Sequence, residues 1–356
     1  MKDQTFEPLK PTRTLYFDYL KVFEYFFMAF VHAASYQWYC TDVNSSSWLV
    51  LNFYKSVTRT SVLPFFMISG ALLLGREIPF KKLFRKYILK LVIVFFAWDF
   101  IYAVITNWNN GLRGMAFKFI NSNYHLWYLL AMIGLYLCFP IFRLIAQNPK
   151  VLKYFLLLSF IFAFVVPSVL AYVSAFGGDS AAQYAGIIKN HITDMHMDAV
   201  LGYSFFFLGG YYIHTNDIGK TLRRTLYIVG AASGIAAAII NAVYVRMLQV
   251  PDDTFENSFM LHEMLLGIAV FIFFKYNVKG RVPFFNNLIV KISSIGLGIY
   301  MVHDLALLGL NKFLHLNGMT FNPIFAVPVT AFAAFVLSVV ISWVLNKIPF
   351  VKKYLV

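Results

Sequence analysis

Long apolar stretches recur along the whole chain, separated by short segments in which polar and charged residues gather. A helix needs about 20 mostly apolar residues to cross a hydrocarbon core of about 30 Å. Stretches of that length predict ten membrane-spanning helices, at residues 15–38, 48–74, 83–106, 125–145, 151–175, 199–214, 223–245, 258–275, 291–311 and 323–346. The sixth is short and rich in glycine. The longest loops, near 107–124 and 176–198, leave no room for a soluble domain.

The composition agrees with this pattern. Hydrophobic residues make up 60% of the 356 residues and charged residues only 13%, whereas a soluble domain carries roughly a quarter charged residues. We therefore expect an all-α polytopic membrane protein, a bundle of about ten transmembrane helices. It should form a single domain over residues 1–356, with short cytoplasmic tails at 1–14 and 347–356. The first apolar stretch lacks a small-residue cleavage site, so it is expected to remain as an uncleaved helix.

Basic residues exceed acidic ones by 30 to 16, for a formal charge of +14. In a soluble protein such an excess would suggest nucleic acid as a partner. Lys and Arg also concentrate in the cytoplasmic loops of membrane proteins. With the N-terminus inside, 22 of the 30 fall in inner segments and 5 in outer loops. This asymmetry predicts that both termini are cytoplasmic, and it explains most of the charge without nucleic acid.

Several ionisable residues lie inside the first predicted span. An ionisable side chain in a span is costly and is therefore a candidate for function. Lys21 and His32 are eleven residues apart, which puts them on one face of a helix about 16 Å apart along its axis. Asp18 and Glu24 flank Lys21 at a spacing that allows ion pairs. The alternative to a functional role is that Asp18, Lys21 and Glu24 neutralise one another at the membrane interface. His32 would then be a packed structural residue.

Other spans add polar residues at a similar depth. Arg59 lies near the centre of the second span, and His303 and Asp304 lie in the ninth. His125 and Trp127 stand at the outer mouth of the fourth, where tryptophan is also a common interfacial residue. Together these residues predict a polar cavity that opens to the outer side, with a basic route leading inward past Lys21.

Four fragments carry a family resemblance in their order and spacing: FDYLKVFEYFFMAFVHA, SVTRTSVLPFFMISG, NYHLWYLLAMIGLYLCFP and GLGIYMVHDLAL. Over roughly residues 15–346 the chain resembles the membrane acyltransferases of family 3. It is most similar to the enterobacterial-common-antigen type of O-acetyltransferase. The resemblance implies ten spans in a bacterial inner membrane. It also implies transfer of an acetyl group from cytoplasmic acetyl-CoA to a hydroxyl of an envelope glycan or lipid-linked sugar.

The resemblance also implies particular site residues. The family has an arginine, ten intervening residues and a histidine in its first helix; this chain has Lys21 and His32. The family's arginine before the FFxISG element matches Arg59. Its tyrosine and histidine in the ninth helix match Tyr300 and His303.

These matches suggest a division of roles. A neutral imidazole is a suitable base for a sugar hydroxyl, so His32 is the expected general base. Arg59 or His303 could stabilise the oxyanion of the tetrahedral intermediate. The phosphates of acetyl-CoA suggest a basic binding site, although the same charges are expected from topology alone. The expected donor-binding residues are Lys21, Lys81, Lys82 and Arg85, and the expected acceptor-side residues are His125, Trp127, Tyr300 and Asp304.

A transporter or lipid-linked-sugar flippase is the alternative, because intramembrane polar residues also serve as relay or binding sites. The chain has only two cysteines, so a disulfide framework is not expected. It has no CxxC or HExxH spacing, so a metal site is not expected either.

Overall fold

The computed structural model describes residues 13–197, 202–280 and 282–356. These residues form helices and connecting turns, with no β-strand among them. Residues 1–12 of the predicted N-terminal tail, residues 199–201 of the predicted sixth span and Arg281 lie outside the described residues.

The first half of the chain holds α1 (Leu15–Trp38), α2 (Ser46–Thr58), η1 (Arg59–Val62), α3 (Leu63–Leu73), α4 (Phe80–Lys82), η2 (Leu83–Ile88), α5 (Leu89–Asn107), η3 (Trp108–Asn110), α6 (Gly111–Asn121), η4 (Tyr124–Leu126), α7 (Trp127–Leu137), α8 (Phe139–Gln147), α9 (Pro149–Ser159), η5 (Phe160–Val165) and α10 (Val166–Phe176). The second half holds α11 (Gly178–Thr193), α12 (Tyr203–Thr215), α13 (Lys220–Leu248), α14 (Leu261–Asn277), α15 (Pro283–Ser294), α16 (Gly296–Leu314), α17 (Pro323–Leu345) and α18 (Pro349–Tyr354).

Six helical segments of the described chain are long and apolar enough to cross a membrane. They are Ser46–Leu73, Phe80–Leu137, Pro149–Phe176, Lys220–Leu248, Gly296–Leu314 and Pro323–Leu345. The 24-residue α1 is not one of them, because Asp18, Lys21 and Glu24 lower its hydropathy. The all-helical membrane architecture is confirmed. The count of ten spans and the cytoplasmic termini stay predictions.

Two stretches expected to be loops contain helices. The stretch 176–198 holds the 16-residue α11, and 107–124 holds the 11-residue α6. Both sequences mix polar and apolar residues, so their hydropathy is too low for a predicted span. Each packs along the helix that precedes it, α11 on α10 and α6 on α5, which buries part of its apolar surface.

The second predicted span is interrupted near its middle. Pro64 has no backbone N–H to donate within a helix, and its ring would clash with the carbonyl four residues earlier. The chain accordingly changes to the 3₁₀ turn η1 before α3 begins, with Pro64 in the first turn of α3. Arg59 is the first residue of this interruption. The break that Pro64 imposes therefore places Arg59 at the junction between α2 and η1.

The glycine-rich sixth span is explained by its contact with α3. A Cβ atom at Gly70 would overlap the backbone of Phe207, and one at Gly210 would overlap the backbone of Met67. Small residues at such a crossing let two helix backbones approach closely, as is common between membrane helices. The close approach places α12 and α3 side by side in the core.

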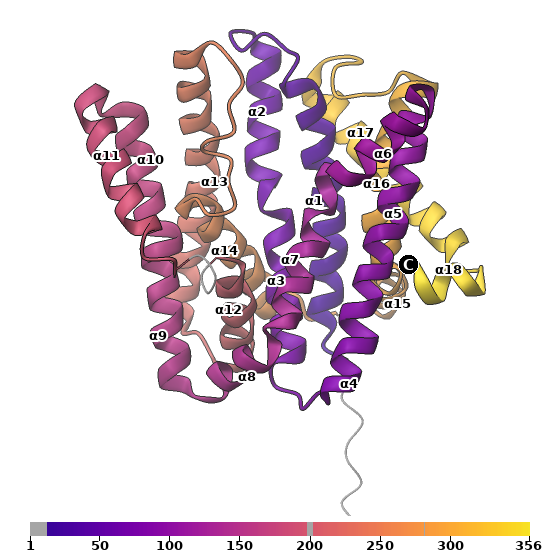
Figure 1. The fold of residues 1–356 in the computed structure, drawn as a ribbon, viewed down its shortest axis with the longest axis horizontal. Helices are drawn as coiled ribbons and strands as arrows, with labels where there is room; N and C mark the ends of the chain where they lie inside the picture. The colour runs from indigo at the N-terminus through magenta and orange to yellow at the C-terminus, as the bar shows by residue number, and fades with distance from the viewer. Residues whose placement is uncertain (1–12, 198–201, 281) are drawn as a thin grey trace, which may run out of the picture.

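Figure 1 shows α10 and α11 side by side at one edge of the bundle and α18 at the opposite edge. Helix α1 begins at the same end as α4 and packs against α2, α15, α16 and α17 in the interior. The predicted tail 347–356 includes α18 and contacts α5: Trp98 Nε1 donates to the Leu355 carbonyl at 2.9 Å, and Lys90 Nζ donates to the Val356 carbonyl at 3.1 Å.

Candidate active site

A buried aspartate, Asp304 on α16, lies at the centre of the polar cluster. Its side chain accepts a hydrogen bond from Tyr124 at 2.7 Å on Oδ1, and Tyr36 donates to the same oxygen. The other oxygen, Oδ2, is 3.8 Å from Nδ1 of His125. Helix α1, the turn η4 and α16 each contribute to this cluster, so residues far apart in sequence meet at one carboxylate.

His32 joins the cluster through Tyr124. The Tyr124 hydroxyl lies 3.3 Å from His32 Nδ1 and donates its only proton to Asp304. The hydroxyl oxygen can therefore only accept from His32, so Nδ1 carries the imidazole proton. The neutral ring then has its lone pair on Nε2, as in sites where a second group fixes the tautomer of a catalytic histidine. The chain Asp304–Tyr124–His32 orients this imidazole as a base.

His303 lies beside His32, with 5.1 Å between the ring centroids. Its Nδ1 is 2.6 Å from the Tyr300 carbonyl, which can only accept, so Nδ1 carries the proton here too. Nε2 of His303 is buried and has no hydrogen-bond partner among the described residues. Nε2 of His32 likewise has no hydrogen-bond partner among the described residues, so two imidazoles each present an Nε2 without a described partner in the same part of the site.

His125 completes the group from the opposite side of Asp304. It is 3% exposed, and its ring centroid is 5.1 Å from that of His303. Neither ring nitrogen has a hydrogen-bond partner among the described residues. Tyr300 donates to the backbone carbonyl of His125, which holds η4 against α16. The structure therefore brings together five of the predicted residues: His32, His125, Tyr300, His303 and Asp304.

Arg59 approaches this group from η1 and is partly exposed. Its charge acts on His32 and on Glu263, whose carboxyl group is 1% exposed on the first turn of α14. Helix α14 packs against η1 and α3, with Gly267 next to Leu63, and Glu263 lies close enough to Arg59 for the two charges to interact. Both Glu263 oxygens lack a hydrogen-bond partner among the described residues.

Trp127 lies apart from the three imidazoles, in an aromatic cluster. Its ring stacks on Tyr203 at 5.3 Å, and Tyr203 stacks on Phe66 at 4.7 Å. Tyr203 also contacts Phe259 at 4.8 Å and interacts with the charge of Arg59. This cluster lines the Arg59 side of the site.

A second polar network ties the loop before α14 to α2. Lys55 is fully buried, pairs with Asp253 at 2.6 Å and with Glu256, and lies 3.4 Å from the centroid of the Trp38 ring. Burial alone would raise the pKa of Asp253. The charge of the Lys55 ammonium and the hydrogen bonds from Lys55 and Tyr39 outweigh this effect, so the pKa lies below its ordinary value of 3.8. The network fixes this loop close to Arg59.

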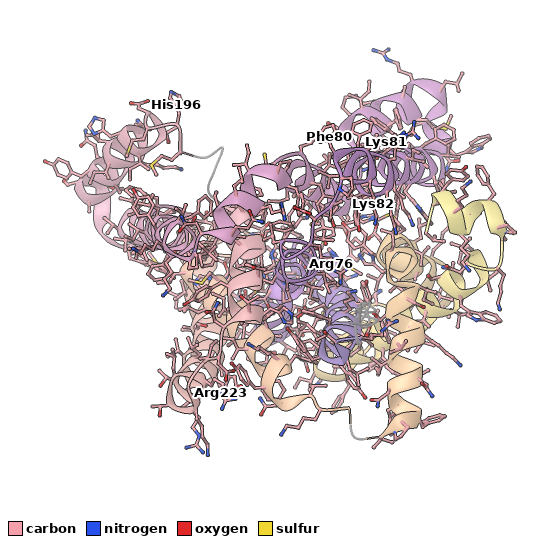
Figure 2. The ribbon with its side chains drawn as sticks, turned by 90° about the horizontal axis from the view of Figure 1, so that it is seen from below. Arg76, Phe80, Lys81, Lys82, His196 and Arg223 are labelled. Carbon is pink, nitrogen blue, oxygen red and sulfur yellow. The ribbon has the colours of Figure 1, made fainter. Side chains whose placement is uncertain are left out.

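The predicted donor-binding residues lie toward the other end of the bundle. In Figure 2, which views that end from below, Lys81 and Lys82 lie near the start of α5 and Arg76 lies nearer the middle. Lys81, Lys82 and Arg85 are exposed. Lys21 has no ion pair among the described residues, because Asp18 is instead bound by Arg13 at 2.7 Å and accepts from Ser293 at 2.7 Å.

Sequence reasoning did not include Tyr36, Tyr124 or Glu263 among the site residues. Tyr36 follows His32 by four residues on the same face of α1, which is a usable signal. Tyr124 and the first turn of α14 lie at predicted span ends, where tyrosine is expected as an interfacial residue.

A cavity of about 190 Å³ begins at Tyr36 and extends between α1, α16 and α17.

Among residues 13–197, 202–280 and 282–356, no group of three His, Cys, Asp or Glu side chains is arranged to hold a metal ion. The family described as an acyltransferase domain, acyltransferase family 3, matches residues 14–347, nearly the whole chain. No curated protein and no solved structure matches the chain.

Proposed function

The chain belongs to acyltransferase family 3, and from this premise we propose that it is a membrane O-acetyltransferase. The acetyl group would come from cytoplasmic acetyl-CoA and pass to a hydroxyl of an envelope glycan or lipid-linked sugar. We further propose that it is of the enterobacterial-common-antigen type and acts in a bacterial inner membrane.

One observation carries the proposal: the hydrogen-bonded chain Asp304–Tyr124–His32 that leaves Nε2 of His32 free. A hydroxyl attacks a thioester slowly unless a base removes its proton as the bond forms. A histidine whose second nitrogen is held by a tyrosine and a carboxylate follows the same logic as the base of a catalytic triad.

His32 and its neighbours can supply the proton transfers and the charge stabilisation that the reaction needs. Nε2 of His32 removes the acceptor hydroxyl proton while the oxygen attacks the thioester carbonyl. The carbonyl oxygen gains negative charge, and the Arg59 guanidinium, whose charge acts on His32, would stabilise it. Collapse of the intermediate breaks the C–S bond, and the His32 imidazolium returns its proton to the departing CoA thiolate. His303, with its free Nε2 beside His32, would stabilise the same intermediate when protonated.

The donor is proposed to arrive from the end of the bundle that carries α4. Lys81, Lys82 and Arg85 are exposed there, as binding of a polyphosphate requires, and Lys21 lies on α1 between them and His32. On the acceptor side, His125, Trp127, Tyr300 and Asp304 would shape the site. Asp304 and Tyr300 would act mainly by holding Tyr124 and His125 in position.

The test is acetyl transfer by the purified protein. With acetyl-CoA labelled in the acetyl group, label should enter an envelope glycan fraction, and CoA should be released in equal amount. Glycan flux across proteoliposomes without label transfer would contradict the proposal and favour the transporter.

His32→Ala should lower turnover by about 10²-fold or more while the protein still inserts, because general-base assistance is worth about 10²–10⁴-fold. His32→Gln should be nearly as damaging, since an amide cannot take the proton. His214→Ala is the control, because His214 bonds Tyr16 away from the site. A well-inserted His32→Ala protein that keeps more than about a tenth of wild-type activity would shift the role to His303.

A further inference from the structure

A cavity of about 830 Å³ lies outside the histidine cluster, at the edge of the bundle where α10 and α11 run side by side (Figure 1). It is more than four times the volume of the cavity at Tyr36 and is within the usual size range for small-molecule sites. The predicted site residues do not line it.

Small side chains on two facing helices open this cavity. Ala163, Pro167 and Ala171 line it from η5 and α10, and Ala185 and Gly186 line it from α11. The α10 side begins at a π-helical turn followed by a proline, a combination that widens and bends a helix. The cavity is thus a feature of helix geometry as well as of side-chain size.

The described residues that line the cavity are mostly apolar. Of the described lining residues only Lys189 is charged, and it is exposed. The polar groups Thr193, Thr254 and Asn257 also lie along the wall. An apolar trough with one cation and no described acidic residue fits a hydrocarbon chain that carries an anionic headgroup.

The cavity adjoins the proposed active site. Phe259 lines the cavity and contacts Tyr203, which stacks on Trp127 and interacts with Arg59. Aromatic rings are the usual surface on which the C–H face of a sugar packs. A glycan leaving the cavity at Phe259 would therefore cross this aromatic cluster toward Arg59 and His32.

We propose that this cavity binds the lipid chain of the acceptor, so that the substrate is a lipid-phosphate-linked glycan rather than a free polysaccharide. The proposal rests on the proposed function and narrows its acceptor. The chain lies between α10 and α11, Lys189 pairs with the phosphate, and the sugar extends over Tyr203 to His32.

The first test measures binding of farnesyl phosphate that carries a diazirine near the end of its chain, in detergent and without acetyl-CoA. After photolysis, labelled peptides should come from residues 163–175 and 185–193. Gly186→Leu should lower this labelling about tenfold, the loss expected when about two buried CH₂ contacts are displaced. A Cβ at Gly186 meets no atom within 4 Å, and leucine favours helix, so this variant should fold.

Gly134→Leu is the matched control. It adds the same side chain to a helical glycine whose Cβ also meets no atom within 4 Å, but on α7 and away from the cavity. Lys189→Gln should weaken labelling by the phosphate about two- to fivefold and leave the matching farnesol probe unchanged. Labelling that Gly186→Leu does not reduce, or that spreads evenly over the lipid-facing helices, would overturn the proposal.

The second test measures acetyl transfer. Gly186→Leu should raise the KM for a lipid-phosphate-linked glycan about tenfold and leave the KM for acetyl-CoA unchanged. A water-soluble glycan should be a poor substrate. The proposal would be contradicted if wild type and Gly186→Leu both acetylated that glycan as fast as wild type acetylates the lipid-linked glycan. Normal photolabelling with no acetyl transfer at all would instead count against the proposed function.

Discussion

At the scale of single residues, the site depends on which nitrogen of each imidazole carries a proton. Tyr124 and the Tyr300 carbonyl decide this for His32 and His303, and both leave Nε2 free. The carboxylate of Asp304 is one step removed from the chemistry, because a tyrosine stands between it and His32. We therefore regard Tyr124 as a positioning residue.

Replacing Tyr124 with phenylalanine should lower kcat about tenfold or more, because it leaves the Nδ1–H of His32 without its acceptor, which costs about 1–3 kcal/mol. Tyr36→Phe is the matched control, since Tyr36 bonds Asp304 but has no described bond to His32. The KM for acetyl-CoA should not change in either variant. Equal losses in the two variants would mean that Tyr124 serves only to satisfy Asp304.

At the scale of elements, α4 and the start of η2, which carry Lys81, Lys82 and Arg85, are expected to bind acetyl-CoA. Lys82→Ala and Arg85→Ala should each raise the KM for acetyl-CoA about two- to fivefold, with a smaller effect at high salt, because exposed charge pairs are weak and screened. Lys21→Ala should act similarly, and Lys21→Arg should be tolerated. Arg224→Ala, an exposed cation at the start of α13, should have no effect. If Lys82→Ala and Arg224→Ala behave alike, the cations of α4 and η2 only set topology.

The loop between α13 and α14 is held by Lys55 through Asp253. Because the folded-state pKa of Asp253 is lowered, its contribution to stability is fully present above about pH 4 and is lost as the pH falls through the lower folded value. The Tm of wild type should thus fall more steeply below pH 4 than the Tm of Asp253→Asn. Asp252→Asn is the control, because Asp252 bonds the Thr254 amide and has no ion pair among the described residues. Parallel Tm curves for wild type and Asp253→Asn would contradict this account.

At the scale of the whole molecule, a native cysteine reports the orientation. Cys40 is exposed just after α1, next to the loop that Tyr39 and Asp253 join. If the N-terminus is cytoplasmic, a membrane-impermeant maleimide should label Cys40 in intact cells. Cys40→Ser should abolish labelling and Cys138→Ser should not, because Cys138 lies between α7 and α8. Labelling of Cys40 only after the membrane is opened would reverse the topology.

The sequence by itself determined the class of the protein and several of its chemical groups. Apolar stretches longer than a bilayer needs can only be buried in lipid, so hydropathy alone predicted a helical membrane protein. The cost of burying a charge singled out His32, Arg59, His303 and Asp304. The six apolar segments and the family match support this level of description.

Only the tertiary structure decided how these groups work together. Hydropathy measures transfer into lipid and says nothing about which helix faces meet. Tyr36 and Tyr124 were therefore not recognised as site residues until the structure showed that α1, η4 and α16 converge on Asp304. Helices α6 and α11 were missed because packing on a neighbour, and not apolar length, stabilises them. The cavity beside α10 and α11 is also lined by Tyr244, Thr254 and Phe259, which lie far from these helices in sequence, so no local pattern could reveal it.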